Sequence, residues 1–358
     1  MAVTSFGTND AQTVKIWSSL LAREVLKLTF FKKFLGSTKR SIIQELKELT
    51  QNAGDTIKYD LLMQMTGAGI DGDNRMKDFE EPLVYYQDSV KINQKRNAHS
   101  FKTMSQQMTL HDMRDDAMLN LADWYAQIYD SYMFRYLGGD TSLSFAGNTG
   151  EVADTDHYIV TGTVPHTGTI TTDEGNLGSD DQFALTDINF AKEKAKTLTP
   201  PIRPAIVDGE EYYAVVLHDY SATDLKLNIS QNTSTTWADI HMYANRRGLK
   251  NNIFTGALGV YEKCILFESS RIYSPSTNVR RNLMLGSQAG VFAQGNAYKK
   301  RHQANVGSGN LFRWFEEVDD YGNEEGIAVA NIFGMKKTRY NSKDYGCMCM
   351  SSYSVLHN

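Results

Sequence analysis

One glycine-rich segment has the residue types and spacing of a phosphate- or metal-binding loop. Residues 67–76 contain the G-x-G-x-x-G pattern of dinucleotide-binding loops, whose glycines let the backbone approach a pyrophosphate at the start of a helix. No helix pattern follows, and no β-α-β pattern surrounds the segment. Asp71 and Asp73 begin like a calcium loop, but Arg75 takes the third ligand position and Pro82 that of the closing glutamate. The segment is therefore better interpreted as the tip of a hairpin.

No catalytic nucleophile with its partners is evident elsewhere. Ser287 lies between two glycines at an offset that does not fit a G-x-S-x-G elbow. His218 and His241 could act as acids or bases, but eight scattered histidines are expected in a chain of 358 residues without catalysis. Cys347 and Cys349 are too close in sequence for an unstrained bridge, and no second pair completes a zinc site. We expect no enzymatic activity, no metal and no cofactor.

Two groups of residues could instead contact macromolecules. Charges on and near the glycine-rich segment, paired across a subunit boundary, would fix register more than they add affinity, although each could also be an ordinary solvated charge. The predicted subunit-interface residues are Tyr59, Leu61, Met63, Arg75, Lys77, Tyr86, Lys91, Lys95, Arg96, Asp112, Asp115 and Asp116. A second, basic group could face DNA through phosphates or form a rim contact; it comprises Arg280, Arg281, Lys299, Lys300 and Arg301.

The element that must position most of these charges is a long two-stranded extension. From Ile57 to Met65, apolar and polar residues alternate except at Leu62, which is the pattern of a half-buried strand. Residues 84–93 alternate less regularly. The connection between the strands is roughly three times the usual hairpin loop length. A flat hairpin that projects from its own core needs a second copy of the protein to lie on, which favours a shell-forming subunit over an enzyme.

One long amphipathic helix is predicted next, over Thr103–Leu137. Apolar residues recur at steps of three and four, and aspartates that include Asp123 and Asp130 fill the other face. Ser105 could cap the helix and Gly138 ends it. About 33 residues at ~1.5 Å each would make a strut about 50 Å long.

Composition narrows the class of protein. A hydrophobic content of 41% and a charged content of 22% are ordinary for a soluble protein, and the net charge of −5 argues against a dedicated nucleic-acid reader. No apolar run approaches the ~20 residues of a membrane span, and Met1–Thr4 does not begin a signal peptide. We therefore expect assembly in a cytosol, without a membrane.

The remaining segments predict an N-terminal arm and a compact α/β layer. Residues 1–50 carry two apolar helical stripes, interpreted as small helices packed on the body or on a neighbour rather than as a membrane-surface anchor. A Gly/Thr-rich insertion over 138–181 includes a short strand at 157–160. The further predicted elements are helices at 184–198 (capped by Thr186 or Asp187) and 234–248, and strands at 212–218, 253–266, 312–317, 326–333 and 347–351.

Several linked blocks resemble the major capsid proteins of tailed phages of the coliphage N-four type. In order, they are EEPLVYYQDSVKINQKRNAHSF (80–101), MSQQMTLHDMRDDAMLNLADWYAQIYD (104–130), IFTGALGVYEKCILFESSRI (253–272), LMLGSQAGVFAQG (283–295) and FEEVDDYGNEEGIAVANIFGMKKTRYNSKDYG (315–346). The resemblance spans roughly residues 5 to 350. It implies an α+β chain with the Hong Kong 97 capsid fold.

The same resemblance implies a division of the chain and a function. The implied parts are an N-arm (1–50), an E-loop hairpin (51–101), the P-domain spine helix with a loop-rich insertion (102–181), an α/β A-domain (182–272) and A/P-domain completion with C-terminal strands (273–358). The implied role is the coat subunit of an icosahedral phage head, assembled in the host cytoplasm as hexamers and pentamers around double-stranded DNA. Implied partners are further copies and a portal protein, with scaffolding and decoration proteins left open. An encapsulin-like or tail structural protein is the alternative.

Overall fold

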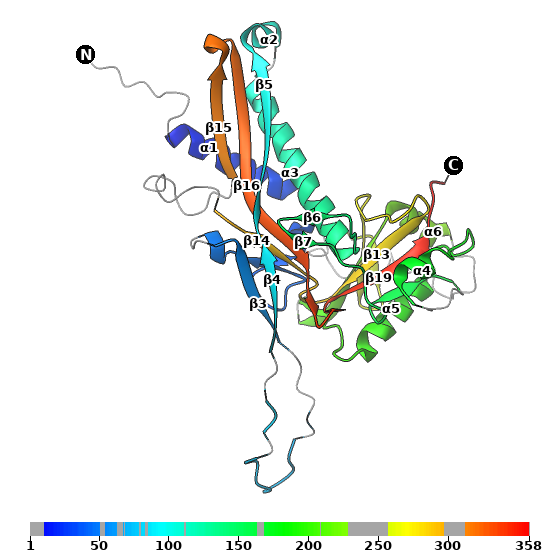
Figure 1. Cartoon of the computed structure of the whole chain (residues 1–358). Helices are drawn as coiled ribbons and strands as arrows, with labels where there is room; N and C mark the ends of the chain where they lie inside the picture. Colours follow the sequence, from blue (N-terminus) through cyan, green and yellow to red (C-terminus); the bar gives the residue numbers. More distant parts are fainter. Residues whose placement is uncertain are drawn as a thin grey trace.

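The protein has an elongated half and a compact half, with one long helix running between them (Figure 1). The structure is a computed structural model that describes residues 11–50, 54–62, 67, 69–78, 80–82, 85–110, 112–162, 168–207, 209–227, 257–296 and 312–357. The elongated half holds a six-stranded sheet and a projecting hairpin, and the compact half holds a seven-stranded sheet with short helices. None of the described helices has the length and apolar character of a bilayer span.

Strand β16 (Glu324–Lys337) organises the elongated sheet because it pairs with three other strands. Its C-terminal end is antiparallel to β14 (Gly290–Gln294), which pairs in parallel with β2 (Ile43–Leu46). Its N-terminal part lies between β15 (Phe312–Asp319) and β5 (Asn93–Lys102). The far end of the sheet is therefore a three-stranded ribbon, β5–β16–β15, called the distal ribbon below. Strands predicted at 312–317 and 326–333 are confirmed.

Helix α3 (Met113–Leu137) packs on the buried face of this sheet. Its 25 residues give a length of about 37 Å. Aromatic rings fill the space beneath it: the centroid of the Tyr129 ring lies 4.8 Å from that of Phe333 and 5.5 Å from that of Phe292. Gly138 ends the helix as predicted, and Gly139 follows at φ +74°, where a side chain would also collide with the backbone of residues 151–152.

The predicted single helix over Thr103–Leu137 is wrong at its start. Residues 103–108 form a separate helix, α2 (Thr103–Met108), and the chain is extended at Thr109. Asp112 then caps α3, because its carboxylate accepts a hydrogen bond from the backbone N–H of Arg114 at 2.9 Å. Ser105, the predicted cap, lies within α2. Helix α3 therefore begins at Met113 and does not extend towards Thr109, because the Asp112 side chain, in place of a preceding helical turn, supplies the acceptor for an N–H of the first turn.

The N-terminal arm contains one of its two predicted helices, α1 (Ala11–Leu28). The 3-10 helix η1 (Phe30–Phe34) follows, and then β1 (Leu35–Gly36), which pairs with β2. The predicted second helix is wrong, because Ile43–Leu46 form β2 beside β14. The only helical turn there is the short η2 (Glu48–Thr50). Pairing with β14 supplies backbone hydrogen bonds that an isolated four-residue helix would lack.

The hairpin consists of β3 (Thr56–Leu62) and β4 (Tyr85–Lys91), as the alternation of residues predicted. Register partners include Ile57 with Val90 and Leu62 with Tyr85. The chain then leaves the hairpin and enters the distal ribbon as β5, so residues 93–102 belong to the six-stranded sheet. Figure 1 shows β3 and β4 beside the elongated sheet and the tip of the hairpin projecting well away from both sheets.

The compact half is built on β10 (Glu210–Leu217), β13 (Val279–Leu285) and β19 (Cys347–Tyr353), which lie side by side at its centre. The sheet is completed by β12 (Cys264–Glu268), β11 (Gly259–Tyr261), β8 (Tyr158–Val160) and β9 (Ala205–Val207). Strands predicted at 157–160, 212–218 and 347–351 are thus confirmed. The single strand predicted at 253–266 is wrong, because β11 and β12 form a hairpin that turns at Glu262 and Lys263, both at positive φ.

Among the described residues, three helices cover the compact sheet: α4 (Ile170–Glu174), α5 (Leu185–Thr197) and α6 (Asp219–Leu227). Helix α5 confirms the prediction at 184–198, and Asp187 supports its start by accepting the N–H of Ala184 at 2.8 Å. The helix predicted at 234–248 lies outside the described residues. Small two-stranded pairs complete the fold: β6 (Ser144–Phe145) with β7 (Asn148–Thr149), and β17 (Arg339–Tyr340) with β18 (Lys343–Asp344).

Candidate assembly interface

The hairpin tip presents its side chains to the outside. Within residues 69–78 no side chain is buried, and Arg75 and Lys77 are exposed without an ion pair inside the described part of the chain. At the base of the tip, the N–H of Gly67 donates a hydrogen bond to the carboxylate of Glu81 at 2.7 Å. A tip with charged side chains and no core of its own is suited to contact another molecule.

The root of the hairpin, by contrast, packs on its own protomer. Ile57, Tyr59, Leu61 and Val90 are buried in a small hydrophobic cluster with side chains of β14 and the segment before β3. Tyr59 and Leu61, predicted as subunit contacts, are therefore internal residues, because the apolar face of β3 already has a partner. The ring of Tyr86 is half-buried 5.5 Å from that of Tyr340. Met63 lies outside the described residues.

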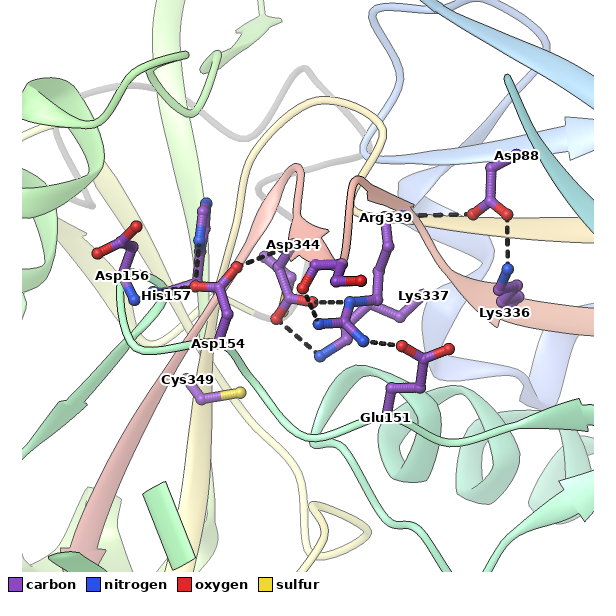
Figure 2. Close-up of polar contacts among 12 residues, drawn as sticks. Asp88, Glu151, Asp154, Asp156, His157, Lys336, Lys337, Arg339, Asp344 and Cys349 are labelled. Carbon is purple, nitrogen blue, oxygen red and sulfur yellow. Dashed lines mark hydrogen bonds and ion pairs between the residues drawn. The ribbon is translucent and has the colours of Figure 1, made fainter. Parts of the chain in front are cut away.

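A single carboxylate connects the hairpin root to the sheet beneath it (Figure 2). Asp88 of β4 lies 2.5 Å from the ammonium of Lys336 and accepts the hydroxyl of Tyr59 at 2.9 Å. Its second oxygen also accepts the backbone N–H of Arg339 at 3.3 Å. At Gly334 a Cβ would collide with the carbonyl oxygen of Lys91, so glycine lets β16 pass directly beneath the hairpin. These contacts set the direction in which the hairpin projects.

The same ion network continues into the compact half. Lys337 lies 2.7 Å from Asp344, and both side chains are almost completely buried. Arg339 lies 2.9 Å from the other oxygen of Asp344 and also pairs with Glu151. Burial raises the pKa of Asp344, although both cations oppose the shift. Burial alone would lower the pKa of Lys337, but Asp344 together with Cys347 and Cys349 outweighs burial, and the pKa rises.

Asp154 ends this network on the side of the compact sheet. Its carboxylate accepts the backbone N–H of Asp344 at 2.8 Å and lies 2.8 Å from Nδ1 of His157. Although burial opposes the shift, these hydrogen bonds hold the pKa of Asp154 below its ordinary value. The chain of contacts from Asp88 to His157 therefore joins the hairpin, the long strand and the compact sheet (Figure 2).

The other predicted interface cations lie on or beside β5. The ammonium of Lys95 donates to the hydroxyl of Tyr132 at 3.0 Å, so this charge is partly used within the protomer. The backbone of Lys91 exchanges two hydrogen bonds with the side chain of Asn148, at 2.8 and 3.0 Å, while its own side chain is exposed. Arg96 is exposed on β5.

The predicted interface aspartates surround the start of α3. Asp112 serves as the cap described above, and Asp115 and Asp116 are exposed in the first turn. Negative charge is favourable there because the free backbone N–H groups carry partial positive charge. A local structural role therefore accounts for Asp112, while the other two remain candidates for contact with a neighbour.

Two of the predicted DNA-facing residues are corrected by the structure, because they are buried. Arg281 forms a two-pronged ion pair with Glu174 at 2.7 and 2.8 Å and donates to the carbonyl of Gly138 at 2.8 Å. It thereby supports the C-terminal end of α3. Arg280 donates to backbone carbonyls of Ser276 and neighbouring residues. Neither guanidinium is free for a phosphate; Lys299, Lys300 and Arg301 lie outside the described residues.

Asp130 was predicted to lie on the polar face of the long helix, and this prediction is wrong because its side chain is buried. Its side chain is completely buried and accepts the backbone N–H groups of Phe30 and Phe31 at 3.0 and 3.3 Å. The guanidinium of Arg271 lies 2.7 Å away. One carboxylate thus fastens the N-terminal arm, α3 and the compact half together. The sequence hint to this role is that Asp130 lies within one helical turn of the buried residues Tyr129 and Met133.

The distal ribbon has an open face opposite α3. Its alternate side chains, placed by the strand register, are Arg96, Ala98, Ser100 and Lys102 on β5, Glu324, Gly326, Ala328 and Ala330 on β16, and Arg313, Phe315, Glu317 and Asp319 on β15. Arg96 and Lys102 are exposed along one edge, and Glu317 and Asp319 along the other. On the central strand, the small residues Gly326 and Ala328 are half-buried and Ala330 is buried. The β5 edge is therefore basic, and the β15 edge is acidic at Glu317 and Asp319 but also carries Arg313.

An elongated sheet, a long supporting helix and a projecting hairpin are features shared with subunits of phage shells. The capsid of Ralstonia phage GP4 matches with a TM-score of 0.80 and 27% identity over 100% of both chains. The cyanophage Pam1 capsid asymmetric unit matches with a TM-score of 0.69 and 19% identity, over 100% of this chain and 95% of that chain. The mixed α+β fold is therefore that of phage capsid subunits.

Sequence comparison identifies the family. Residues 5–356 match the phage capsid protein family, so the chain belongs to that family. The major capsid protein of Pseudomonas phage KPP25 is 28% identical over 381 aligned positions, which cover 95% of this chain and 94% of the relative. The protein is a structural component of a phage shell, the role that the hairpin and helix pattern predicted.

Proposed function

We propose that this chain is the major capsid protein of a tailed phage with the Hong Kong 97 fold, assembling as hexamers and pentamers around double-stranded DNA. The proposed parts are the N-arm (1–50), an E-loop hairpin, a P-domain that includes α3 and the distal ribbon, and an A-domain centred on the compact sheet. The pairing of β5 with β16 moves the end of the E-loop from residue 101 to about Lys91. The N-four-type relationship remains part of this proposal.

The observation that carries the proposal is the hairpin, whose root is rigidly held and whose tip has no core. A buried cluster and Asp88 fix the root, while the side chains of residues 69–78 face outwards. Each subunit both extends a hairpin and receives one. Contacts of modest affinity then add up to a stable shell, because every subunit makes several of them at once.

We further propose the open face of the distal ribbon as the surface that receives a neighbour's hairpin. Its central strand carries the small, half-buried residues Gly326 and Ala328, so an extended backbone can approach closely there. The tip carries both signs of charge, with Arg75 and Lys77 among aspartates, which matches a surface with one basic and one acidic edge. Such charge pairs would mainly fix register and exclude wrong alignments.

The experiment that tests this function removes the tip and leaves the root intact. Leu62 and Tyr85 are register partners, so an Asn-Gly turn replacing residues 63–84 would join them as an ordinary two-residue hairpin. We expect a folded, soluble subunit with an unchanged melting temperature that forms no shells in sedimentation and negative-stain microscopy. Particles of normal size and yield from this variant would contradict the proposal.

A further inference from the structure

The N-terminal arm is electrostatically distinct from the rest of the chain. Residues 11–50 contain eight lysines and arginines and three acidic residues, a net charge of +5. The rest of the sequence contains 29 basic and 39 acidic residues, a net charge of −10. Positive charge is therefore concentrated in about one ninth of an acidic protein, which is the distribution expected of a surface that meets a polyanion.

Most of these cations are not neutralised within the protomer. Lys27 pairs with Glu24 at 2.6 Å and Lys47 pairs with Glu45 at 2.8 Å. Five others with described side chains make no ion pair among the described residues: Arg23, Lys32, Lys33, Lys39 and Arg40. Of these, only Lys33 is half-buried, and the rest are exposed.

Part of this surface forms a depression of about 740 Å³ between the arm, α3 and the end of β12. Lys27, Lys32 and Lys33 line it, together with the Asp130–Arg271 pair. The carboxylate of Asp130 accepts two backbone N–H groups and pairs with that arginine, whose positive charge offsets its negative charge in the lining. Glu268 at the rim lies 3.8 Å from Lys226, and Asp219 is the remaining acidic residue of the lining.

Lys33 is the cation of the arm whose surroundings favour an incoming anion most directly. Its ammonium lies 4.0 Å from the ring centroid of Phe30 and 3.9 Å from that of Phe267. Burial against these rings lowers the pKa of Lys33 to about 8, although Asp130 opposes the shift. A desolvated ammonium held between two rings gains from an incoming negative group more than a fully hydrated one does.

We propose that the arm binds phosphates of packaged double-stranded DNA without reading its sequence. The contacts are made by the lysines that line the depression, Lys27, Lys32 and Lys33, and by the exposed Arg23, Lys39 and Arg40. These six cations are called the arm surface below. The proposal rests on the proposed capsid function. Four of the six cations are lysines, which act as point charges, so the surface suits regularly spaced backbone phosphates more than a shaped acidic peptide. This surface replaces Arg280 and Arg281, which the structure shows to be buried.

The test uses the full-length subunit and double-stranded DNA of mixed sequence, followed by fluorescence anisotropy from 50 to 200 mM salt. The arm variant carries K32Q, K33Q, K39Q and R40Q. The matched control removes four exposed lysines elsewhere, with K58Q, K102Q, K196Q and K263Q. We expect the arm variant to bind at least about tenfold more weakly at low salt with a shallower salt dependence, because each lost phosphate contact removes about 0.9 from the slope. Two duplexes of different sequence should give the same affinity.

Three outcomes would overturn the inference. They are no binding of DNA by the native subunit, equal loss in the arm variant and the control, and polyglutamate that competes as well as DNA at equal charge. Circular dichroism and melting temperatures establish that both variants fold. The proposed capsid function is tested separately by the hairpin experiment. An arm variant that builds shells and binds DNA with native affinity would therefore contradict DNA binding by the arm surface and leave the capsid function in place.

Discussion

At the scale of single residues, the most consequential side chains in this protein are buried charges that join distant segments. Asp130 receives hydrogen bonds from Phe30 and Phe31, about a hundred positions earlier, and pairs with Arg271, 141 positions later. Arg281 and Glu174 form a comparable link beneath the end of α3. Breaking a buried pair by removing one partner typically costs about 3–5 kcal/mol, since the other charge stays buried. Such residues specify how the parts of the subunit are docked.

Asp130 makes the folding stability of the subunit depend on pH. Burial raises the pKa of Asp130 to about 6, above its ordinary value of 3.8, despite the opposing hydrogen bonds and Arg271. The folded state therefore holds this proton more tightly than the unfolded chain. The resulting stabilisation is complete below about pH 4 and is lost as the pH rises through 6. Relative to pH 7.5, the Asp130 contribution at pH 5 should be about 1.4 kcal/mol more favourable.

The variant Asp130→Asn isolates this effect. The amide keeps one acceptor for the arm but does not titrate in this range. Urea unfolding of both proteins at pH 7.5 and pH 5.0 should show the stability difference shifting by about 1.4 kcal/mol in favour of the wild type at the lower pH. Other titrating groups, such as Asp187, are present in both proteins and cancel. Identical pH dependence in the two proteins would show that Asp130 does not titrate with folding.

At the scale of elements, the contacts of the hairpin root fix the direction in which β3 and β4 project from the sheet. Among the described charged side chains of β3 and β4, Asp88 is the one that forms an ion pair with the sheet beneath, through Lys336 of β16. Asp88→Ala leaves the ammonium of Lys336 and the hydroxyl of Tyr59 without their acceptor. Because both ion-pair partners retain some solvent contact, we expect a cost of about 2 kcal/mol rather than the full value for a buried pair.

Hydrogen exchange can assign that loss to the correct element. In Asp88→Ala, amides of Thr56–Leu62 and Tyr85–Lys91 should exchange faster, while those of α3 keep their protection. Asp60→Ala is the matched control, since Asp60 lies on the solvent face of β3. Faster exchange throughout the molecule would mean that Asp88 supports global stability and does not specifically orient the hairpin.

The spacing of apolar and polar residues correctly predicted the elements that pack on a single partner along their whole length. The hairpin strands alternate because one face packs on the body, and the stripe of α3 is regular because the helix crosses one sheet. The spacing of Ile42, Ile43, Leu46 and Leu49 fits a helix, yet parallel pairing with β14, about 250 residues away, makes β2 a strand. Thr109–Asp112 are compatible with helix, so only the cap geometry reveals the break. The partners of Arg281 and Asp130 lie about a hundred positions away or more, beyond the reach of local spacing.

At the scale of the whole molecule, the proposed assembly gives each subunit two surfaces that meet other copies. The hairpin tip and the open face of the distal ribbon lie in different parts of the elongated half, so one chain cannot dock its own tip on its own ribbon (Figure 1). This arrangement is heterologous: one surface of each copy meets a different surface of the next. Heterologous contacts close into rings or continue without end. A ring of six such contacts should therefore be sensitive to a single defective member.

Mixing experiments make this sensitivity measurable. If a fifth of the subunits lack residues 63–84, about a quarter of randomly composed six-membered rings contain only intact copies. We therefore expect shell yield, measured by sedimentation, to fall to well below half, because a subunit without a tip still accepts a hairpin and then fails to pass the contact on. The same fraction of Asp60→Ala subunits should leave the yield unchanged. A loss of only a fifth would mean that each subunit joins independently and that the hairpin does not carry the contact around the ring.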